Sequence, residues 1–518
     1  MIDQSYLRNP GLFFVFFLCF VFPGQAQSLT DWHKSYCDTL QGLRSKEALA
    51  FLNSKHLKPK RQIILAIIDS GIDTTVVDLQ AALWKNPKEK LDGKDNDRNG
   101  YVDDLNGWNF LGTKDGSFNM ISAGTQEYRE FKRLFPKYKY CDSTMIPEDT
   151  TEYAYYKKMR KKAGIQNYLR FFEYVSLKNE AYRSLDSLLR LQPLLAKDTL
   201  TLEGLRQLSM TDDELWNKAY QSILVDIYRA NRHTRWDELM EGHQEQFDLM
   251  RKRIEGIEKD RDKRLLMGDD MKDIDDRFYG NRILQTEDCE HGTIVAGIIA
   301  GQGKSAGSPQ GIYPEARLMI IRAVPNGDEY DKDVATAIRY AVDNGAKIIN
   351  LSLGKYNSPQ ADMVSQAIAY AARKDVLLLQ SAGNNARNID SLSYFPASKD
   401  KKGKVFPNYM RVGASDKQGK PCSFSNYGKE EVDVFAPGVE VTSVTVGGRY
   451  TQSQGTSIAS PAAAATAAII RSYFPRLKAA QVKNILIETA RPLPSNKYCR
   501  GGVIDALRAV ESAMEIAK

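Results

Sequence analysis

A serine lies at the start of a predicted alanine-rich helix, in the sequence Gly-Thr-Ser-Ile-Ala-Ser-Pro at residues 455–461. Pro461 is tolerated in the first turn, because the N–H that it lacks would have no helical partner there. Ser457 therefore combines an exposed hydroxyl with a free backbone N–H at a helix N-terminus, which favours negative charge. A catalytic serine needs both groups, since the hydroxyl is the nucleophile and the N–H supplies half of an oxyanion hole. Taken alone, the segment is also compatible with a capped packing helix.

A nucleophilic serine needs a base, and the base needs a carboxylate that orients it. Of the five histidines, four lie among charged or polar residues. His291 instead begins the sequence His-Gly-Thr-Ile-Val-Ala-Gly, whose glycines allow close helix packing. Asp69 ends the apolar run 63–68, which predicts a fully buried parallel strand. Because the sites of open α/β sheets assemble at the carboxyl ends of strands, Asp69 is the candidate for this carboxylate.

The order Asp, His, Ser is the order found in subtilisin, and it differs from the orders in chymotrypsin and the α/β-hydrolases. The chain resembles the subtilisin-like serine peptidases (subtilases) over about residues 61–113 and 286–512. Five motifs carry the resemblance: Asp-Ser-Gly-Ile-Asp at 69–73, His-Gly-Thr at 291–293, Ile-Asn-Leu-Ser-Leu-Gly at 349–354, Ser-Ala-Gly-Asn at 381–384 and Gly-Thr-Ser at 455–457.

The resemblance implies an α/β fold with a doubly wound, mostly parallel sheet. The composition of the long segment between Asp69 and His291 predicts that this fold carries an inserted all-α subdomain. It also implies a mechanism in which Ser457 attacks the scissile carbonyl, His291 transfers the proton and Asp69 orients the imidazole. The Asn384 amide and the Ser457 N–H would stabilise the oxyanion.

The same resemblance assigns the residues that hold the peptide. An extended substrate would pair with one segment as an added strand, and a second segment would form the opposite wall of the main specificity pocket. Because both walls consist of small residues, we expect room for a sizeable apolar side chain. The first segment is Ser352, Leu353 and Gly354, and the second is Ser381, Ala382 and Gly383.

The N-terminus resembles a secretory signal peptide over residues 1–26, with an apolar core at 12–22 that is too short to span a bilayer comfortably. After cleavage we expect a periplasmic or secreted protein without a stable membrane anchor; an uncleaved anchor is the alternative. The following segment, 27–60, is shorter than the folding prodomain of many secreted subtilases. Five cysteines remain in the mature chain, so at least one thiol should be unpaired.

An insertion at 114–285 separates two parts of the catalytic domain, 61–113 and 286–518. It is poor in Gly and rich in Lys, Arg, Glu, Leu and Tyr, and segments 153–191 and 212–276 predict helices. We interpret it as a stabilising addition, as a module that gates the site or docks a partner, or as a substitute for a prodomain. The net charge of +7 arises from interspersed Lys and Glu, so nucleic-acid binding is not expected.

An acidic loop at 92–104 places hard oxygen donors at alternate positions around Gly100, with the spacing of an EF-hand-like calcium loop. A solvated acidic turn is the other interpretation. We predict a structural Ca²⁺ site formed by Asp95, Asp97, Asn99, the Tyr101 carbonyl and Asp103 or Asp104.

These observations together favour a serine endopeptidase that acts on protein or peptide substrates through an acyl-enzyme. A transacylase or peptide cyclase could use the same three residues while excluding water. A non-catalytic peptide-binding protein is disfavoured, because all four catalytic positions are intact.

Overall fold

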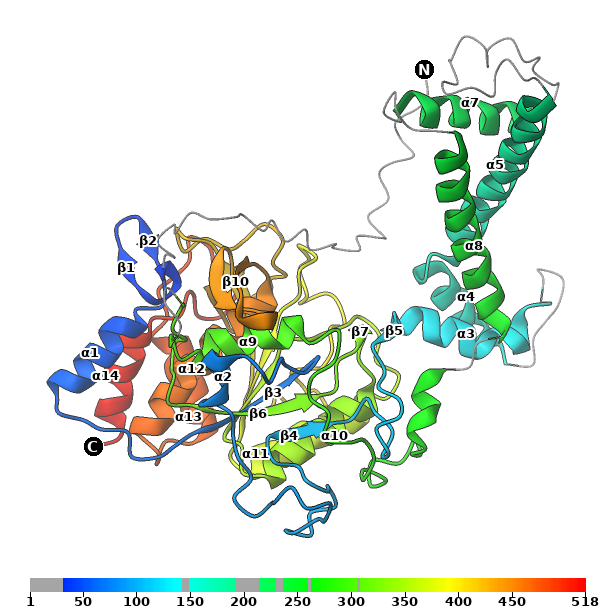
Figure 1. Cartoon of the computed structure of the whole chain (residues 1–518). Helices are drawn as coiled ribbons and strands as arrows, with labels where there is room; N and C mark the ends of the chain where they lie inside the picture. The colour runs from blue at the N-terminus through cyan, green and yellow to red at the C-terminus, as the bar shows by residue number, and fades with distance from the viewer. Residues whose placement is uncertain (1–30, 142–148, 192–213, 230–235, 260–261, 305–307) are drawn as a thin grey trace. The chain divides into compact units, whose positions relative to one another are not determined.

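The computed structural model describes residues 31–141, 149–191, 214–229, 236–259, 262–304 and 308–518. The described residues form two compact units (Figure 1). The sheet unit contains those of 16–126 and 263–518, and the helical unit contains those of 127–262. The expected signal peptide at 1–26 lies outside the described residues.

The sheet unit is built on a seven-stranded sheet in which all neighbouring strands are parallel. Most of these strands are rich in apolar residues, since helices cover both faces of the sheet. The strands, in spatial order, are β11 (Val434–Pro437), β10 (Tyr409–Ser415), β9 (Leu377–Ser381), β8 (Ile348–Leu351), β3 (Ile64–Asp69), β6 (Arg317–Arg322) and β4 (Gly107–Asn109).

Two hydrophobic cores lie on the two faces of this sheet, and β3 contributes alternate residues to each. Leu65 and Ile67 belong to the first core, whereas Ala66 and Ile68 belong to the second. Helices therefore cover both faces, which confirms the doubly wound α/β fold. The first core is covered by α9 (Glu290–Ala300), α12 (Thr456–Tyr473), α13 (Ala479–Glu488) and α14 (Ala506–Ile516), and the second by α10 (Asp331–Asp343) and α11 (Ala361–Arg373).

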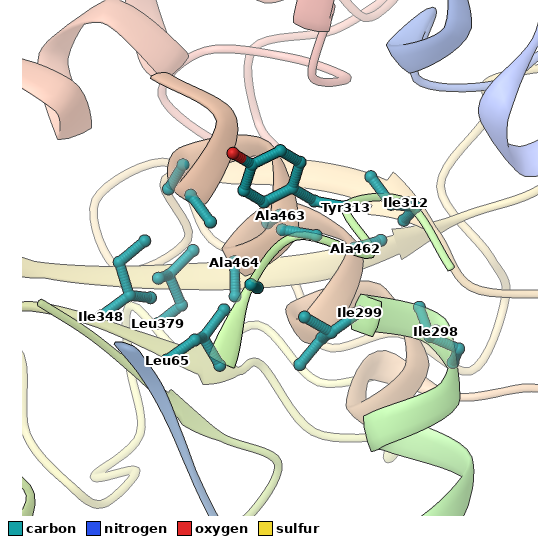
Figure 2. Packing of buried hydrophobic residues seen from close by; sticks show 14 of the residues in the cluster. Leu65, Ile298, Ile299, Ile312, Tyr313, Ile348, Leu379, Ala462, Ala463 and Ala464 are labelled. Carbon is teal, nitrogen blue, oxygen red and sulfur yellow. The ribbon is translucent and has the colours of Figure 1, made fainter. Parts of the chain in front are cut away.

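The alanine-rich helix α12 packs directly on the sheet. Figure 2 shows Ala462–Ala464 among Leu65, Ile348 and Leu379 of three neighbouring strands. Methyl side chains allow the helix backbone to approach the sheet closely, so the start of α12 is fixed relative to the strand ends.

The segment before β3 is part of the sheet unit's first core. Trp32 and Leu52 are buried there, and Arg44 Nη1 donates to Asp505 Oδ2 at 3.1 Å, just before α14. Its elements are η2 (Trp32–Lys34), β1 (Tyr36–Cys37), β2 (Leu40–Gln41) and α1 (Ser45–Ser54). The remaining short elements of the sheet unit are α2 (Val77–Gln80), β5 (Ser122–Gly124), η3 (Lys263–Met267), β7 (Asn326–Gly327), β12 (Val441–Val444), η4 (Val446–Gly448) and β13 (Tyr450–Ser453).

The points where the chain leaves and re-enters the sheet unit are both fixed within that unit. Before the helical unit, β5 pairs with β7. After it, the Arg264 guanidinium is buried and donates to Asp333 at 2.6 Å and to Asp269 at 3.0 Å. Buried charges are stable only when they are paired in this way, so this cluster holds the returning chain against α10.

Among the described residues of the helical unit, the regular elements are all helices, which agrees with the expected all-α insertion. One apolar cluster includes Tyr182 and Leu185 of α5 with Ile223 of α7. A second includes Phe131 of α3 and Tyr156 of α4. The helices are α3 (Gln126–Tyr138), α4 (Thr150–Lys162), α5 (Ile165–Leu191), α7 (Glu214–Arg229) and α8 (Trp236–Lys259).

Two helix predictions were wrong in their extent. The helix expected over 153–191 is divided at Gly164, whose φ of +68° ends α4, because glycine adopts this conformation readily. The segment 212–276, expected to be helical, contains α7 and α8 among its described residues, but α8 ends at Lys259 and 268–276 form bends and a turn. There the carboxylates of Asp270 and Asp273 accept backbone N–H groups two residues ahead, in competition with a helix.

No helix in the described part of the chain is both long and apolar enough to cross a bilayer.

Candidate active site

The carboxyl ends of three adjacent strands bring the predicted site residues to one edge of the sheet. Asp69 is the last residue of β3, Ser352 follows β8 directly, and Ser381 ends β9. Helices α9 and α12, which carry His291 and Ser457, pack against each other and against this sheet.

Asp69 and His291 form a direct hydrogen bond. Asp69 is 2% exposed, and its Oδ1 lies 2.7 Å from His291 Nδ1 while also accepting the Ser70 N–H at 2.8 Å. The imidazole is 38% exposed. The carboxylate thus holds the ring by one nitrogen and leaves part of the ring accessible, as a base requires.

The absence of a side chain at Gly292 makes this contact possible. A Cβ at this position would lie 2.0 Å from the Gly71 carbonyl oxygen and 3.3 Å from Asp69 Oδ1. The same turn is held to α9 by Thr293 Oγ1, which accepts the Asp73 N–H at 2.8 Å. The glycine in the His-Gly-Thr sequence therefore allows the helix to approach the end of β3.

Arg322, which the sequence analysis did not include, fixes the same turn from the other side. It is fully buried at the end of β6, and its Nε donates to the Ser70 carbonyl at 3.0 Å and to Thr286 Oγ1 at 2.9 Å. Its Nη2 donates to Asp288 Oδ1 at 3.0 Å. The sequence offered one signal for Arg322, a charged residue at the end of an apolar run.

The pKa of His291 reflects opposing effects. Burial lowers the pKa, whereas the charge and hydrogen bond of Asp69, together with the charge of Glu290, raise it. The second effect prevails, and the pKa lies above the ordinary value of 6.5.

Ser457 is the second residue of α12 and is partly exposed. The helix is preceded by Gly455, whose φ is +139°. A Cβ on Gly455 would lie 3.2 Å from Ser457 Oγ, 3.3 Å from Asn384 Nδ2 and 3.8 Å from Ser457 N. One hydroxyl and two nitrogens thus surround a single point that a side chain would fill, and glycine keeps it clear.

Thr456 orients the Asn384 side chain. Asn384 Oδ1 accepts hydrogen bonds from Thr456 N and Thr456 Oγ1, both at 2.9 Å, while Thr456 Oγ1 accepts the Gly383 N–H at 3.0 Å. With its oxygen engaged, the amide presents its nitrogen to the space beside Gly455. Sequence reasoning identified Asn384 but not this partner.

A chain of hydrogen bonds joins α12 to β8. Ser352 Oγ donates to the Ser457 carbonyl at 2.9 Å and accepts from Asn350 Nδ2 at 2.9 Å. Asn350 Oδ1 in turn accepts from Ser460 Oγ at 2.8 Å. The side chain of Ser352, expected among the substrate-binding residues, thus holds the first turn of α12.

The two predicted pocket walls lie side by side. Ser381 Oγ donates to the Leu353 carbonyl at 3.3 Å, and Leu353 and Ala382 are buried. Gly354 and Gly383 both approach the hydroxyl of Tyr394: a Cβ on them would lie 2.3 and 2.7 Å from Tyr394 Oη. Tyr394 was absent from the sequence analysis, because nothing in its sequence neighbourhood indicates this position.

In the acidic loop, the structure groups Asp95 and Asp97 with Glu89. One carboxylate oxygen from each lies within 4.8 Å of the others. Glu89 is 6% exposed, and its oxygens accept the N–H groups of Asp97 and Asp103 at 2.9 and 3.2 Å. Glu89 precedes the predicted loop, so the spacing argument did not include it.

The other predicted ligands lie around this cluster. Asn99 donates its N–H to Asp95 Oδ1 at 3.0 Å, and its Nδ2 donates to Asp97 Oδ2 at 3.2 Å and to Asp104 Oδ2 at 3.0 Å. Asp103 Oδ1 accepts the N–H groups of Asp92 and Gly93. The Tyr101 ring is buried, and its hydroxyl donates to the Arg277 carbonyl at 3.1 Å. These side chains support the loop around the cluster of three carboxylates.

The model of the subtilase family matches residues 60–501. The chain belongs to the subtilase family. Subtilases are serine endopeptidases. The family match confirms the resemblance found in the sequence and agrees with the α/β fold.

Two relatives show how much of the chain is shared. It is 37% identical over 222 residues to a thermophilic serine proteinase of Bacillus sp. (strain AK1), covering 42% of this chain and 52% of that proteinase. It is 36% identical over 226 residues to a cell wall-associated protease of Bacillus subtilis (strain 168), covering 43% of this chain and 24% of that protease. The chain thus spans about half the length of the first relative and about a quarter of the second.

Among solved structures, the subtilase is similar to the prenylagaramide maturation protease PagA. The two share 31% identity, and the match covers 43% of this chain and 82% of that chain, with a TM-score of 0.38. The fold assignment rests on the parallel sheet and the family match.

Gly292→Ala tests the close approach of α9 to β3. The methyl group would overlap the Gly71 carbonyl, displacing His291 from Asp69, and a displacement of about 1 Å can cost about 10²-fold in reactivity. We expect fluorophosphonate labelling of the variant to slow by about that factor. Gly242→Ala is the matched control, because its Cβ would meet no atom within 4 Å. Equal labelling rates for the two variants would contradict this account of Gly292.

Proposed function

We propose that this subtilase is an endopeptidase that hydrolyses peptide bonds through an acyl-enzyme, with Asp69, His291 and Ser457 as its triad. The supporting observation is the hydrogen bond of 2.7 Å between Asp69 and His291, on the same sheet edge as an accessible serine at a helix N-terminus. A buried carboxylate, an imidazole and a serine in this arrangement are what acyl transfer requires.

In the first step, His291 accepts the Ser457 proton while Ser457 Oγ attacks the scissile carbonyl. Asp69 favours the tautomer with the proton on Nδ1 and stabilises the imidazolium that forms. The imidazolium then donates its proton to the leaving amine, and water attacks the acyl-enzyme by the same route in reverse. Each proton moves between the substrate, water and the protein, so the cycle restores the starting state.

The oxyanion of each tetrahedral intermediate would lie in the space beside Gly455. Asn384 Nδ2 and Ser457 N border this space, and both can donate to a developing negative charge. Because Thr456 already orients the amide, little reorganisation is needed when the charge forms. The segments 352–354 and 381–383 would hold the peptide on the two sides of the serine.

We further propose that the protein is exported to the periplasm or secreted. Residues 1–26 resemble a signal peptide, and one relative is a cell wall-associated protease by name. Peptides and proteins in that compartment are its proposed substrates.

Hydrolysis of casein and of chromogenic peptides, with Ser457→Ala beside the wild type, tests the proposed activity. We expect the variant to lose at least about 10⁴-fold in kcat. Ser391→Ala, at an exposed position, is the control and should keep full activity.

Retained hydrolysis by a folded Ser457→Ala protein would contradict the proposal. So would a wild type that joins the acyl group to an added amine instead of releasing it to water, because that result would assign the same triad to a transacylase.

The raised pKa of His291 predicts the acidic limb of the pH profile. Protonated His291 cannot accept the Ser457 proton, so kcat/KM should rise with pH through an apparent pKa above 6.5. Asp69→Asn removes the charge that raises this pKa, and should move the limb to lower pH while reducing kcat by about 10⁴-fold. Measuring kcat/KM from about pH 5 to about pH 9 gives the apparent pKa of the acidic limb for the wild type and for the variant. A limb that stays in place in the variant would refute the assignment of Asp69.

We propose Ca²⁺ as a structural ion at Glu89, Asp95 and Asp97. Three carboxylates gather there, with one oxygen of each within 4.8 Å of the others. Hard oxygen donors of this kind suit Ca²⁺, which would offset their mutual repulsion. When bound, the ion would stabilise the loop that precedes β4.

Thermal unfolding in a Ser457→Ala background, which avoids self-digestion, tests the ion site. Calcium at about one hundred times its dissociation constant adds about 2.7 kcal/mol, and should raise Tm by several degrees over the same protein with chelator. Glu89→Gln combined with Asp97→Asn should abolish the difference, whereas Asp115→Asn, in another loop, should not. Equal Tm values for the unsubstituted loop with calcium and with chelator would exclude a stabilising site.

A further inference from the structure

We propose that Tyr394 closes the main specificity pocket, so that the enzyme cleaves after residues with small side chains: glycine, alanine and serine. This inference rests on the proposed function, because it assigns the substrate class of the same site. It departs from the expectation drawn from the two walls alone, which left room for a sizeable apolar side chain.

Next to Gly354 and Gly383, the side chain of Tyr394 occupies the space between the two walls. A Cβ on Gly354 would lie 2.3 Å from Tyr394 Oη and 2.5 Å from its Cζ; one on Gly383 would lie 2.7 and 3.0 Å from the same atoms. The end of one phenol ring therefore touches both walls. Any substrate side chain inserted as deeply between them would overlap it, since non-bonded carbon atoms need about 3.5 Å.

Neighbouring side chains hold the ring in place. Tyr394 is 6% exposed, and it packs edge-on against Tyr356 at 5.2 Å between ring centroids. The buried Arg411 guanidinium lies 5.3 Å from the ring centroid and donates to the Tyr394 carbonyl at 3.3 Å. Tyr394 also shares a buried apolar cluster with Ala382 and Phe435. Moving the ring aside would disrupt these contacts.

The groups behind the ring are fixed in turn. Arg411 donates to Glu431 Oε2 at 2.7 Å, to Gln380 Oε1 at 2.9 Å and to the Pro396 carbonyl at 2.8 Å. Tyr356 accepts from Asn426 Nδ2 at 2.9 Å. A ring supported on these sides sets a fixed depth for the pocket, and a rigid wall discriminates by size more strongly than one that yields.

The depth of the specificity pocket in front of the Tyr394 ring determines which substrate side chains fit. A hydrogen or a methyl group ends before the phenol, and a serine adds one oxygen. Leucine and phenylalanine carry several further carbon atoms into the volume of the ring. One misfit methylene in a pocket changes kcat/KM by about 10–200-fold, so a residue with several should be cleaved at least about 100-fold more slowly than alanine.

The test compares peptide p-nitroanilides that differ only in the residue before the scissile bond: Gly, Ala, Ser, Leu, Phe and Lys. We expect the wild type to prefer Ala over Phe in kcat/KM by at least about 100-fold. Tyr394→Gly should open the pocket and raise the Phe-to-Ala ratio by a similar factor. Tyr394→Phe, which removes only Oη and keeps the ring, should raise the ratio much less than Tyr394→Gly does.

Tyr427→Gly is the matched control. Tyr427 packs on the same apolar cluster as Tyr394, but its atoms are not among the three nearest to a Cβ on Gly354 or Gly383. Its removal should change stability and leave the ratio unchanged. An equal rise of the Phe-to-Ala ratio in Tyr427→Gly and Tyr394→Gly would show a general loosening and overturn the proposal.

Active-site titration with a fluorophosphonate separates this inference from the proposed function. A wild type that is not labelled would refute the proposed function, and the inference with it. A labelled wild type that cleaves after Phe, Leu or Lys as fast as after Ala would overturn the role of Tyr394 alone. The wild-type series decides this point even if Tyr394→Gly does not fold.

Discussion

The site depends on one steric constraint, the close approach of α9 to the turn that follows β3. The Gly71 carbonyl occupies the place of a Cβ at Gly292, and only this approach brings His291 Nδ1 to 2.7 Å from Asp69 Oδ1. The turn in question is buried between α9 and Arg322, which holds the Ser70 carbonyl. A hydrogen bond to a charged group gains strength where water is excluded, so packing and electrostatics depend on the same contact.

The second half of the site follows a similar rule. Gly455 leaves open the point that Ser457 Oγ and Asn384 Nδ2 border, and the hydrogen bonds of Thr456 and Ser352 fix the surrounding backbone and amide. The parallel sheet makes both halves possible, because its strand ends meet at one edge. The helical unit leaves this framework intact, since β5 and η3 attach the flanking chain within the sheet unit.

Much of the fold and the candidate site could be predicted, because each motif states a local physical requirement. The apolar run before Asp69 indicates a buried strand, and the glycine directly after His291 indicates a close approach of its helix. Tyr394 could not be predicted, since its role depends on segments that meet only in the folded chain. Glu89 was missed because it lies just before the acidic loop, and Arg322 because its charge at the end of an apolar strand does not reveal which turn it contacts. The extent of the long helices was missed for another reason: Gly164 ends a helix inside a segment whose apolar periodicity continues.

The central claim is that Asp69, His291, Ser457 and Asn384 act as one site. A crystal structure of the protein after inactivation by diisopropyl fluorophosphate tests it most directly. The account predicts phosphorus bonded to Ser457 Oγ and a phosphoryl oxygen within about 3 Å of Asn384 Nδ2 and Ser457 N, with the Asp69–His291 hydrogen bond retained. A phosphorylated residue other than Ser457, or a phosphoryl oxygen directed away from Asn384, would contradict it.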